Sequence, residues 1–78
     1  MIVAILYSDG TQECQRVESL LQSLEQKYIR YELDRDFTPK QFEAEFGYGA
    51  SYPQVAIGTQ HVGTLKDTLN YYKGKGLL

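Results

Sequence analysis

The sequence predicts a single α/β domain over residues 1–78, in which a four-stranded mixed sheet is flanked by three helices. Three observations lead to this fold class. A buried apolar run is followed at once by an amphipathic helix, which is the first half of a βαβ unit. A second helix begins at a complete capping signal, and two short β segments joined by a tight turn precede the last helix. The predicted element order is therefore β-α-β-α-β-β-α.

Apolar patterning predicts the first strand and helix. Residues 2–7 (IVAILY) form a continuous apolar run with β-branched members, which is typical of a strand buried on both faces. A helix is predicted over residues 11–26, because apolar residues recur there at spacings of three and four. These residues are Val17, Leu20, Leu21 and Leu24.

Alternation and capping chemistry predict the next two elements. Residues 28–33 alternate as a second parallel strand would, with one drier face (Ile29, Tyr31, Leu33) and one wetter face (Tyr28, Arg30, Glu32). The following helix has Thr38 as N-cap, Pro39 at its first position and Gln41 closing a capping box. Phe37 is expected to pack on Phe42, and Gly47 to stop the helix after residue 46.

A hairpin and a last helix complete the prediction. Residues 53–57 and 60–63 are short β segments separated by Gly58-Thr59, which is typical of an antiparallel pair. The last helix is expected to begin near Thr64, with Asp67 closing a capping box, and to end at Gly74. Its predicted apolar face consists of Leu65, Leu69 and Tyr72.

Composition and charge favour a soluble globular chain. Eight basic and ten acidic residues give a net charge of −2, without the Lys/Arg cluster that phosphate contacts need, so no nucleic-acid partner is expected. The apolar run at residues 1–7 is too short to span a membrane, and no small-residue cleavage site follows it. The single cysteine, Cys14, cannot form an internal disulfide, which favours a reducing compartment. Cys14 and the single histidine, His61, cannot supply a typical zinc site without carboxylates, so no metal is expected.

The segments able to carry chemistry follow the element order. Tyr7-Ser8 ends the first strand, Thr11-Gln12-Glu13-Cys14 opens the first helix, and residues 53–64 (PQVAIGTQHVGT) span the hairpin. In these features the chain resembles the glutaredoxin branch of the thioredoxin superfamily. That family has Tyr-Ser/Thr, Cys-x-x-Cys, Val-Pro-Gln-Val-Phe-Ile and a Gly-Gly before an acidic turn at these places. The resemblance covers nearly the whole chain and implies a thioredoxin-like fold and thiol-disulfide exchange, with glutathione as cosubstrate.

The resemblance also implies a glutathione site. In the family, the backbone of the residue before a cis-proline pairs with the cysteinyl part of glutathione, which assigns this role to Tyr52 and predicts a cis Tyr52–Pro53 bond. The γ-glutamyl end would meet Gly63, Thr64 and Asp67: its carboxylate would accept N–H groups at the helix N-terminus, and its ammonium would meet Asp67. Thr64 stands where the family usually has glycine, so a narrower pocket is expected.

The first helix carries the main departure from the family. Aligning the apolar face of this helix with that of the family places Cys14 at the second, resolving cysteine of Cys-x-x-Cys and Thr11 at the first, nucleophilic cysteine. The alternative alignment makes Cys14 the nucleophile, and it needs a longer loop before the helix and a later helix start. At 100° per residue, Cys14 lies within about 20° of Leu21, so its thiol is predicted to face the core. A packed core cysteine and a reactive thiol both stay open for Cys14. Thr11 is not expected to react, because no base activates its hydroxyl, and it is predicted to be a helix N-cap. Asp9 stands where many family members have a cation, and its charge disfavours a thiolate.

Two functions of different classes follow. The first is a glutaredoxin-like enzyme of electron transport that engages glutathione or glutathionylated protein thiols and exchanges disulfides through Cys14 by a monothiol route, since an intramolecular disulfide needs two cysteines. The alternative is a redox-inactive thioredoxin-fold module that keeps the glutathione or peptide groove for binding. A cluster-binding monothiol glutaredoxin is disfavoured, because Gly-Phe-Ser does not follow the cysteine. We expect a cytoplasmic monomer.

The remaining polar and aromatic residues are predicted to be structural. His61 is expected on the exposed face of a hairpin strand. Five tyrosines are expected to be half-buried packing residues with a hydrated hydroxyl. These are Tyr28, Tyr31, Tyr48, Tyr71 and Tyr72.

Overall fold

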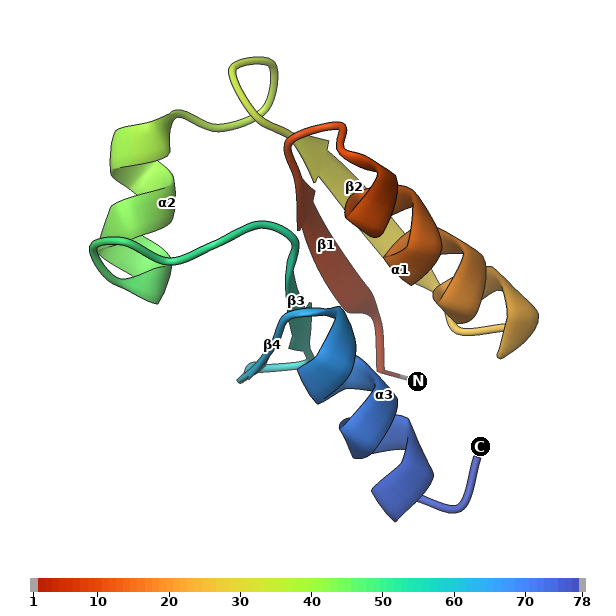
Figure 1. Ribbon diagram of the computed structural model, residues 1–78. Helices are drawn as coiled ribbons and strands as arrows, with labels where there is room; N and C mark the ends of the chain where they lie inside the picture. The colour runs from red at the N-terminus through yellow and green to blue at the C-terminus, as the bar shows by residue number, and fades with distance from the viewer. Residues whose placement is uncertain (1, 78) are drawn as a thin grey trace.

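A computed structural model describes residues 2–77, which form seven elements in the predicted order (Figure 1). They are β1 (Ala4–Ser8), α1 (Gln12–Ser23), β2 (Tyr28–Glu32), α2 (Pro39–Phe46), β3 (Gln54–Ile57), β4 (Gln60–Gly63) and α3 (Leu65–Gly74). The predicted domain spans residues 1–78, and its first and last residues lie outside the described range.

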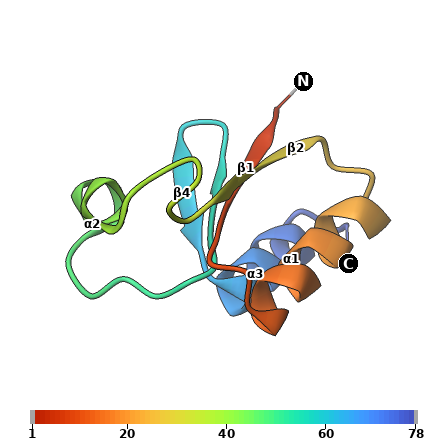
Figure 2. The same cartoon turned by 90° about the horizontal axis from the view of Figure 1, so that it is seen from above.

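The strands form one mixed sheet in the order β2-β1-β3-β4, so the predicted fold class is confirmed. β1 runs parallel to β2, from Ala4 opposite Tyr28 to Ser8 opposite Glu32. β3 runs antiparallel to both β1 and β4, and the two-residue Gly58-Thr59 turn closes the β3–β4 hairpin. Figure 2 shows α1 and α3 together on one face of the sheet and α2 on the other. The sheet therefore separates a layer of two helices, α1 and α3, from a layer formed by α2 alone.

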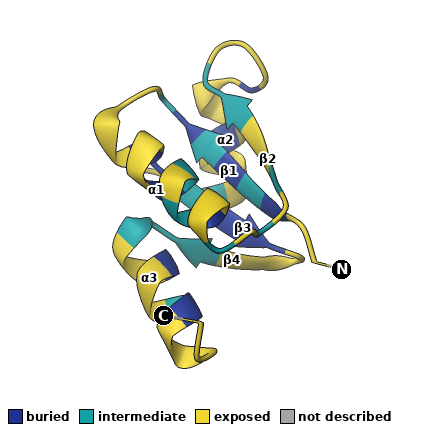
Figure 3. Cartoon of the chain, turned by 90° about the vertical axis from the view of Figure 1, so that its right-hand side faces the viewer, coloured by how far each residue is buried: buried dark blue, intermediate teal, exposed yellow. Residues whose placement is uncertain are grey.

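The main core lies between the sheet and the α1–α3 layer. Its buried members are aliphatic except for one tyrosine of α3: Ala4, Leu6, Val17, Leu21, Val55, Ile57 and Tyr72. Figure 3 shows this buried stripe along β1, β3 and the inner side of α3. Removing each large aliphatic side chain from water contributes about 1.5–3 kcal/mol, so this layer supplies most of the apolar stabilisation.

The two strands at the α2 side differ from the sequence prediction. β1 is not buried on both faces: Leu6 is fully buried, but Ile5 and Tyr7 are half-buried, because α2 covers only part of their face. In β2 the predicted drier face is only partly buried, since Ile29 is 46% exposed, whereas Tyr28 of the predicted wetter face is half-buried and packs toward α1. The Tyr28 hydroxyl and Arg30 Nη1 donate to Glu18 at 2.9 and 3.2 Å. The apolar parts of the Tyr28 and Arg30 side chains thus cover the surface of α1, while their polar ends stay hydrated.

The predicted start of α2 is confirmed in detail. Thr38 accepts from the Gln41 backbone N–H at 3.2 Å and donates its own N–H to the Gln41 side chain at 2.9 Å. Pro39 is the first helical residue, and Gly47 ends the helix at φ +102°. The Phe37 and Phe42 rings stack with centroids 5.8 Å apart, as the staple requires. The nearby Tyr48 is 94% exposed rather than half-buried, because it follows the helix into a turn that no other element covers.

α3 departs from its prediction on its buried face. Thr68, and not Leu69, lies on the buried face with Tyr72; the Thr68 hydroxyl is satisfied by donating to the Thr64 carbonyl at 2.8 Å, which permits its burial. The helix ends at Gly74, as predicted. The left-handed residue that turns the chain is Gly76, at φ +76°.

Candidate functional site

Three chain segments meet at one end of the sheet. Because β1 and β3 are antiparallel, Tyr7 near the end of β1 lies opposite Gln54 at the start of β3. Gly63 at the end of β4 lies opposite Val55. The β1–α1 loop, the segment before β3 and the start of α3 therefore reach the same end of the sheet, as Figure 2 shows. The structure thus brings the predicted site residues, Thr11, Cys14, Tyr52, Pro53, Gly63, Thr64 and Asp67, to this end.

Cys14 faces inward from the first turn of α1. Its side chain is 2% exposed, which confirms the orientation derived from helical phase. The thiol donates to Asp9 Oδ1 at 3.3 Å, and the Thr11 hydroxyl donates to the Cys14 sulfur at 3.3 Å. Thr11 has the backbone conformation of an N-cap, but its side chain makes no capping hydrogen bond because the hydroxyl is directed to the sulfur. The sulfur is therefore held between one acceptor and one donor.

The charge at Asp9 decides the state of this cluster. Partial burial by itself would raise the pKa of Asp9, but hydrogen bonds from Cys14 and Thr11 outweigh it and lower the pKa below its ordinary value. Asp9 is consequently ionised at neutral pH and acts as an acceptor. Because an ionised carboxylate can only accept, the sulfur is the donor in the contact between Cys14 and Asp9.

The Tyr52–Pro53 peptide bond is cis, as predicted. Pro53 is fully buried, and the Tyr52 ring stacks on Phe42 with centroids 4.1 Å apart and planes 20° from parallel. Burial raises the pKa of the Tyr52 hydroxyl, and the charge of Asp9 is the next contribution in the same direction. The ring thereby links this end of the sheet to the α2 layer.

The turn before α3 is built around one carboxylate. Asp67 Oδ2 accepts the backbone N–H and the hydroxyl of Thr64, each at 3.1 Å, which confirms the predicted capping box. Gly63 adopts φ +122°, and a Cβ at this position would overlap the Asp67 carboxylate and lie 3.0 Å from the Asp67 Cβ. Glycine is therefore required here on both conformational and steric grounds.

Two kinds of feature are absent from residues 2–77. Within this range, no three histidine, cysteine, aspartate or glutamate side chains gather closely enough to hold a metal ion. In the same range, no helix is both long and apolar enough to cross a bilayer.

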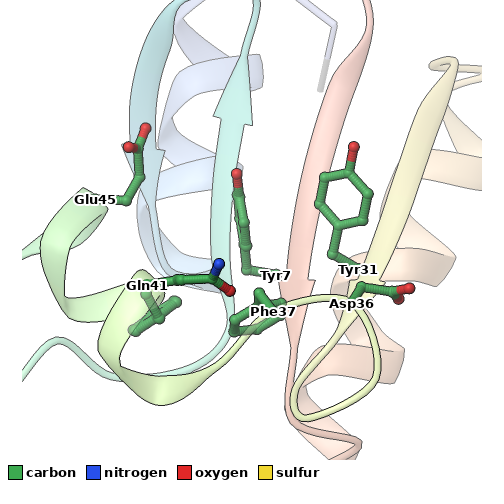
Figure 4. A pocket seen from close by; sticks show the side chains of 7 residues that line it. Tyr7, Tyr31, Asp36, Phe37, Gln41 and Glu45 are labelled. Atoms are coloured by element: carbon green, nitrogen blue, oxygen red, sulfur yellow. The ribbon is translucent and has the colours of Figure 1, made fainter.

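A concave feature lies on the α2 face, where sequence reasoning predicted none. It is a groove of about 310 Å³ between α2 and strands β1 and β2 (Figure 4). It is lined by Tyr7, Tyr31, Asp36, Phe37, Gln41, Phe42 and Glu45. His61 is exposed as predicted, but its Nε2 also lies 2.8 Å from Glu45 Oε1, which ties β4 to α2.

Comparison with known proteins bears on the fold. No protein-family model matches the sequence, and no curated protein matches it either. Among solved structures, the crystal structure of glutaredoxin 1 from Francisella tularensis complexed with cacodylate superposes with a TM-score of 0.77. The match covers 99% of this chain and 98% of that chain at 16% sequence identity. The fold is thioredoxin-like. A likeness at this identity describes the architecture, and function has to be argued from the site.

Proposed function

We propose that this chain is a glutaredoxin-like protein that engages glutathione, or glutathionylated protein thiols, and exchanges disulfides through Cys14. The observation that carries the proposal is the convergence, in a thioredoxin-like fold, of the only cysteine, a buried cis-proline and the Gly63–Asp67 turn at one end of the sheet. Its cellular setting in this proposal is cytoplasmic, with a single 1–78 domain acting as a monomer.

The proposed exchange follows a monothiol route. The Cys14 thiol first loses its proton to solvent, and the thiolate attacks the glutathionyl sulfur of a mixed disulfide. This forms a Cys14–glutathione disulfide and releases the partner thiolate, which takes up a proton from solvent. The thiolate of a second glutathione then attacks the bound glutathionyl sulfur, which releases Cys14 and glutathione disulfide. Because the sulfur is buried and hydrogen-bonded to Asp9, the segment from Asp9 to Thr11 must open for the first attack.

The proposed glutathione contacts follow the resemblance. The backbone of Tyr52 before Pro53 would pair with the cysteinyl part, while N–H groups at the start of α3 would receive the γ-glutamyl carboxylate. Asp67 uses only Oδ2 for the Thr64 cap, so its Oδ1 is the acceptor proposed for the γ-glutamyl ammonium. No metal takes part in this proposal.

The test is glutathione-dependent reduction of a small glutathione mixed disulfide by the wild-type chain and by Cys14→Ser. The proposal expects turnover by the wild type and its loss in Cys14→Ser, which is nearly isosteric and keeps the fold. Absence of turnover in the wild type, or turnover equal in both proteins, contradicts the exchange reaction.

A second candidate is favoured by the state of the sulfur itself. A thiol that is 2% exposed and donates to an ionised carboxylate is the arrangement of an inert structural cysteine, so a redox-inactive module that keeps the glutathione or peptide groove is the alternative. Amide shifts on adding glutathione to Cys14→Ser distinguish the cases. Shifts at Tyr52, Gly63, Thr64 and Asp67 without turnover in the wild type support the binding module. Turnover supports the enzyme.

A further inference from the structure

The groove on the α2 face is lined mainly by aromatic rings. Tyr7 lies at its centre, with the Tyr31 ring centroid 5.6 Å away and the Phe37 centroid 5.3 Å away. Figure 4 shows the Tyr7 and Tyr31 hydroxyls and the Glu45 carboxylate at the same end of the groove. Ring faces beside a carboxylate attract an organic cation through both charge and the aromatic quadrupole.

The two carboxylates that line the groove differ in the groups that already contact them. Asp36 is paired with a guanidinium, because its Oδ2 accepts from Arg35 Nε and Nη2 at 3.1 and 2.9 Å, and the same oxygen accepts the Glu32 N–H at 2.8 Å. Glu45 contacts His61 through Oε1 alone, and its Oε2 receives no hydrogen bond from residues 2–77. Burial, and then the charge of Glu45, raise the pKa of the Tyr7 hydroxyl, so a negative field reaches the groove's centre.

An apolar strip continues from the groove along the sheet. Strand register pairs Tyr7 with Tyr31 and, two residues earlier, Ile5 with Ile29, so both pairs lie on the α2 face. Ile29 is largely exposed and Ile5 half-buried, because α2 does not extend over them. The two pairs are about 6.6 Å apart, which is also the distance between residues i and i+2 of an extended peptide.

We propose that this groove binds an arginine side chain of a partner protein, presented on an extended segment whose apolar residue two positions away packs on Ile5 and Ile29. The guanidinium lies over the Tyr7 and Tyr31 rings and donates to Glu45 Oε2. A guanidinium is planar and carries several N–H donors, so it can stack on the aromatic rings and donate to the carboxylate at the same time. The apolar strip favours a protein segment over a free cation, because a small guanidinium compound leaves the strip uncovered. The groove lies on the opposite face of the sheet from Cys14, so this binding is separate from the thiol chemistry.

The test is amide-shift titration of the whole ¹⁵N-labelled chain with acetyl-Leu-Ser-Arg-Ser-Leu-amide. This peptide has a leucine two residues before and two residues after the arginine, so a leucine can reach the apolar strip in either orientation of the peptide. Saturable shifts are expected at Tyr7, Ile29, Tyr31 and Glu45. The matched peptide with citrulline, which keeps the shape and removes the charge, is expected to bind about tenfold more weakly or worse. Blocked arginine without the leucines is expected to lose about tenfold as well.

Two variants on one exposed helix provide the matched control. Glu45→Gln removes the proposed acceptor's charge and is expected to weaken the arginine peptide about tenfold, whereas Glu43→Gln, outside the groove, is expected to leave binding unchanged. Equal affinity for the arginine and citrulline peptides, or unchanged binding by Glu45→Gln, overturns the proposal. Blocked arginine that binds as tightly as the peptide overturns the assignment to a protein segment.

Discussion

Gly63→Ala tests the steric account of the turn before α3. An alanine at φ +122° carries backbone strain of about 1–2 kcal/mol. Its Cβ would also displace the Asp67 carboxylate, which would cost the capping interaction with Thr64, about 1 kcal/mol. We expect the variant to lose about 2–3 kcal/mol of unfolding free energy. For a domain of this size, that corresponds to a melting temperature lower by roughly 10–20 °C.

A double-mutant cycle isolates the clash. Asp67→Ala alone is expected to cost about 1 kcal/mol, because only the cap is lost. In the double variant Gly63→Ala/Asp67→Ala the cap is lost once and the strain remains, so its cost should stay at about 2–3 kcal/mol, below the sum of the single costs. Urea unfolding followed by circular dichroism measures all three. Strict additivity, or a loss below about 1 kcal/mol in Gly63→Ala, would refute the reasoning.

Three further predictions concern the thiol, acid stability and the aromatic layer. Asp9→Asn keeps an acceptor for the Cys14 thiol but makes it neutral, which weakens the charge-assisted hydrogen bond that holds the sulfur inward. Alkylation of Cys14 by iodoacetamide at neutral pH is therefore expected to accelerate about tenfold, and an unchanged rate would mean that this hydrogen bond does not restrain the sulfur. Because the folded pKa of Asp9 is lowered, its stabilisation is present above its ordinary pKa, about 3.9, and is lost as pH falls through the folded value. Urea unfolding at about pH 5 and about pH 2.5 should therefore show a smaller loss in Asp9→Asn than in the wild type, and equal losses would count against the shift. Phe42→Ala should cost about 3–5 kcal/mol in the same assay at neutral pH, because this buried ring stacks on Tyr52 and Phe37. A cost near 1 kcal/mol would mean that the aromatic layer is loosely packed.

Local signals in the sequence were sufficient for the element order and the helix starts. The Thr38 and Thr64 capping boxes depend on residues three apart, so they can be read without knowledge of the tertiary structure. The inward direction of Cys14 follows from its angle to Leu21 on the same helix. The cis Tyr52–Pro53 bond required the family resemblance, because the residue pair alone does not select the isomer.

Features that depend on packing between elements were not predictable in the same way. The exposure of Ile29 depends on how far α2 extends over β2, and alternation along one strand contains no information about its neighbours. The groove needs the parallel register that places Tyr7 beside Tyr31, together with the position of Glu45 on a distant helix. Thr68 replaces Leu69 on the buried face because a hydrogen bond to Thr64 satisfies its hydroxyl, which hydrophobicity alone does not anticipate.

The contact between Thr11 and Cys14 has a kinetic consequence. The group that lies 3.3 Å from the sulfur is a hydroxyl, and the sequence has no second cysteine whose thiol could displace a group bound to Cys14. Any disulfide formed at Cys14 therefore joins two molecules, and its breakdown by exchange is bimolecular in the attacking thiol. The lifetime of such an adduct is then set by the concentration of thiol in the surrounding solution rather than by a rate built into the fold.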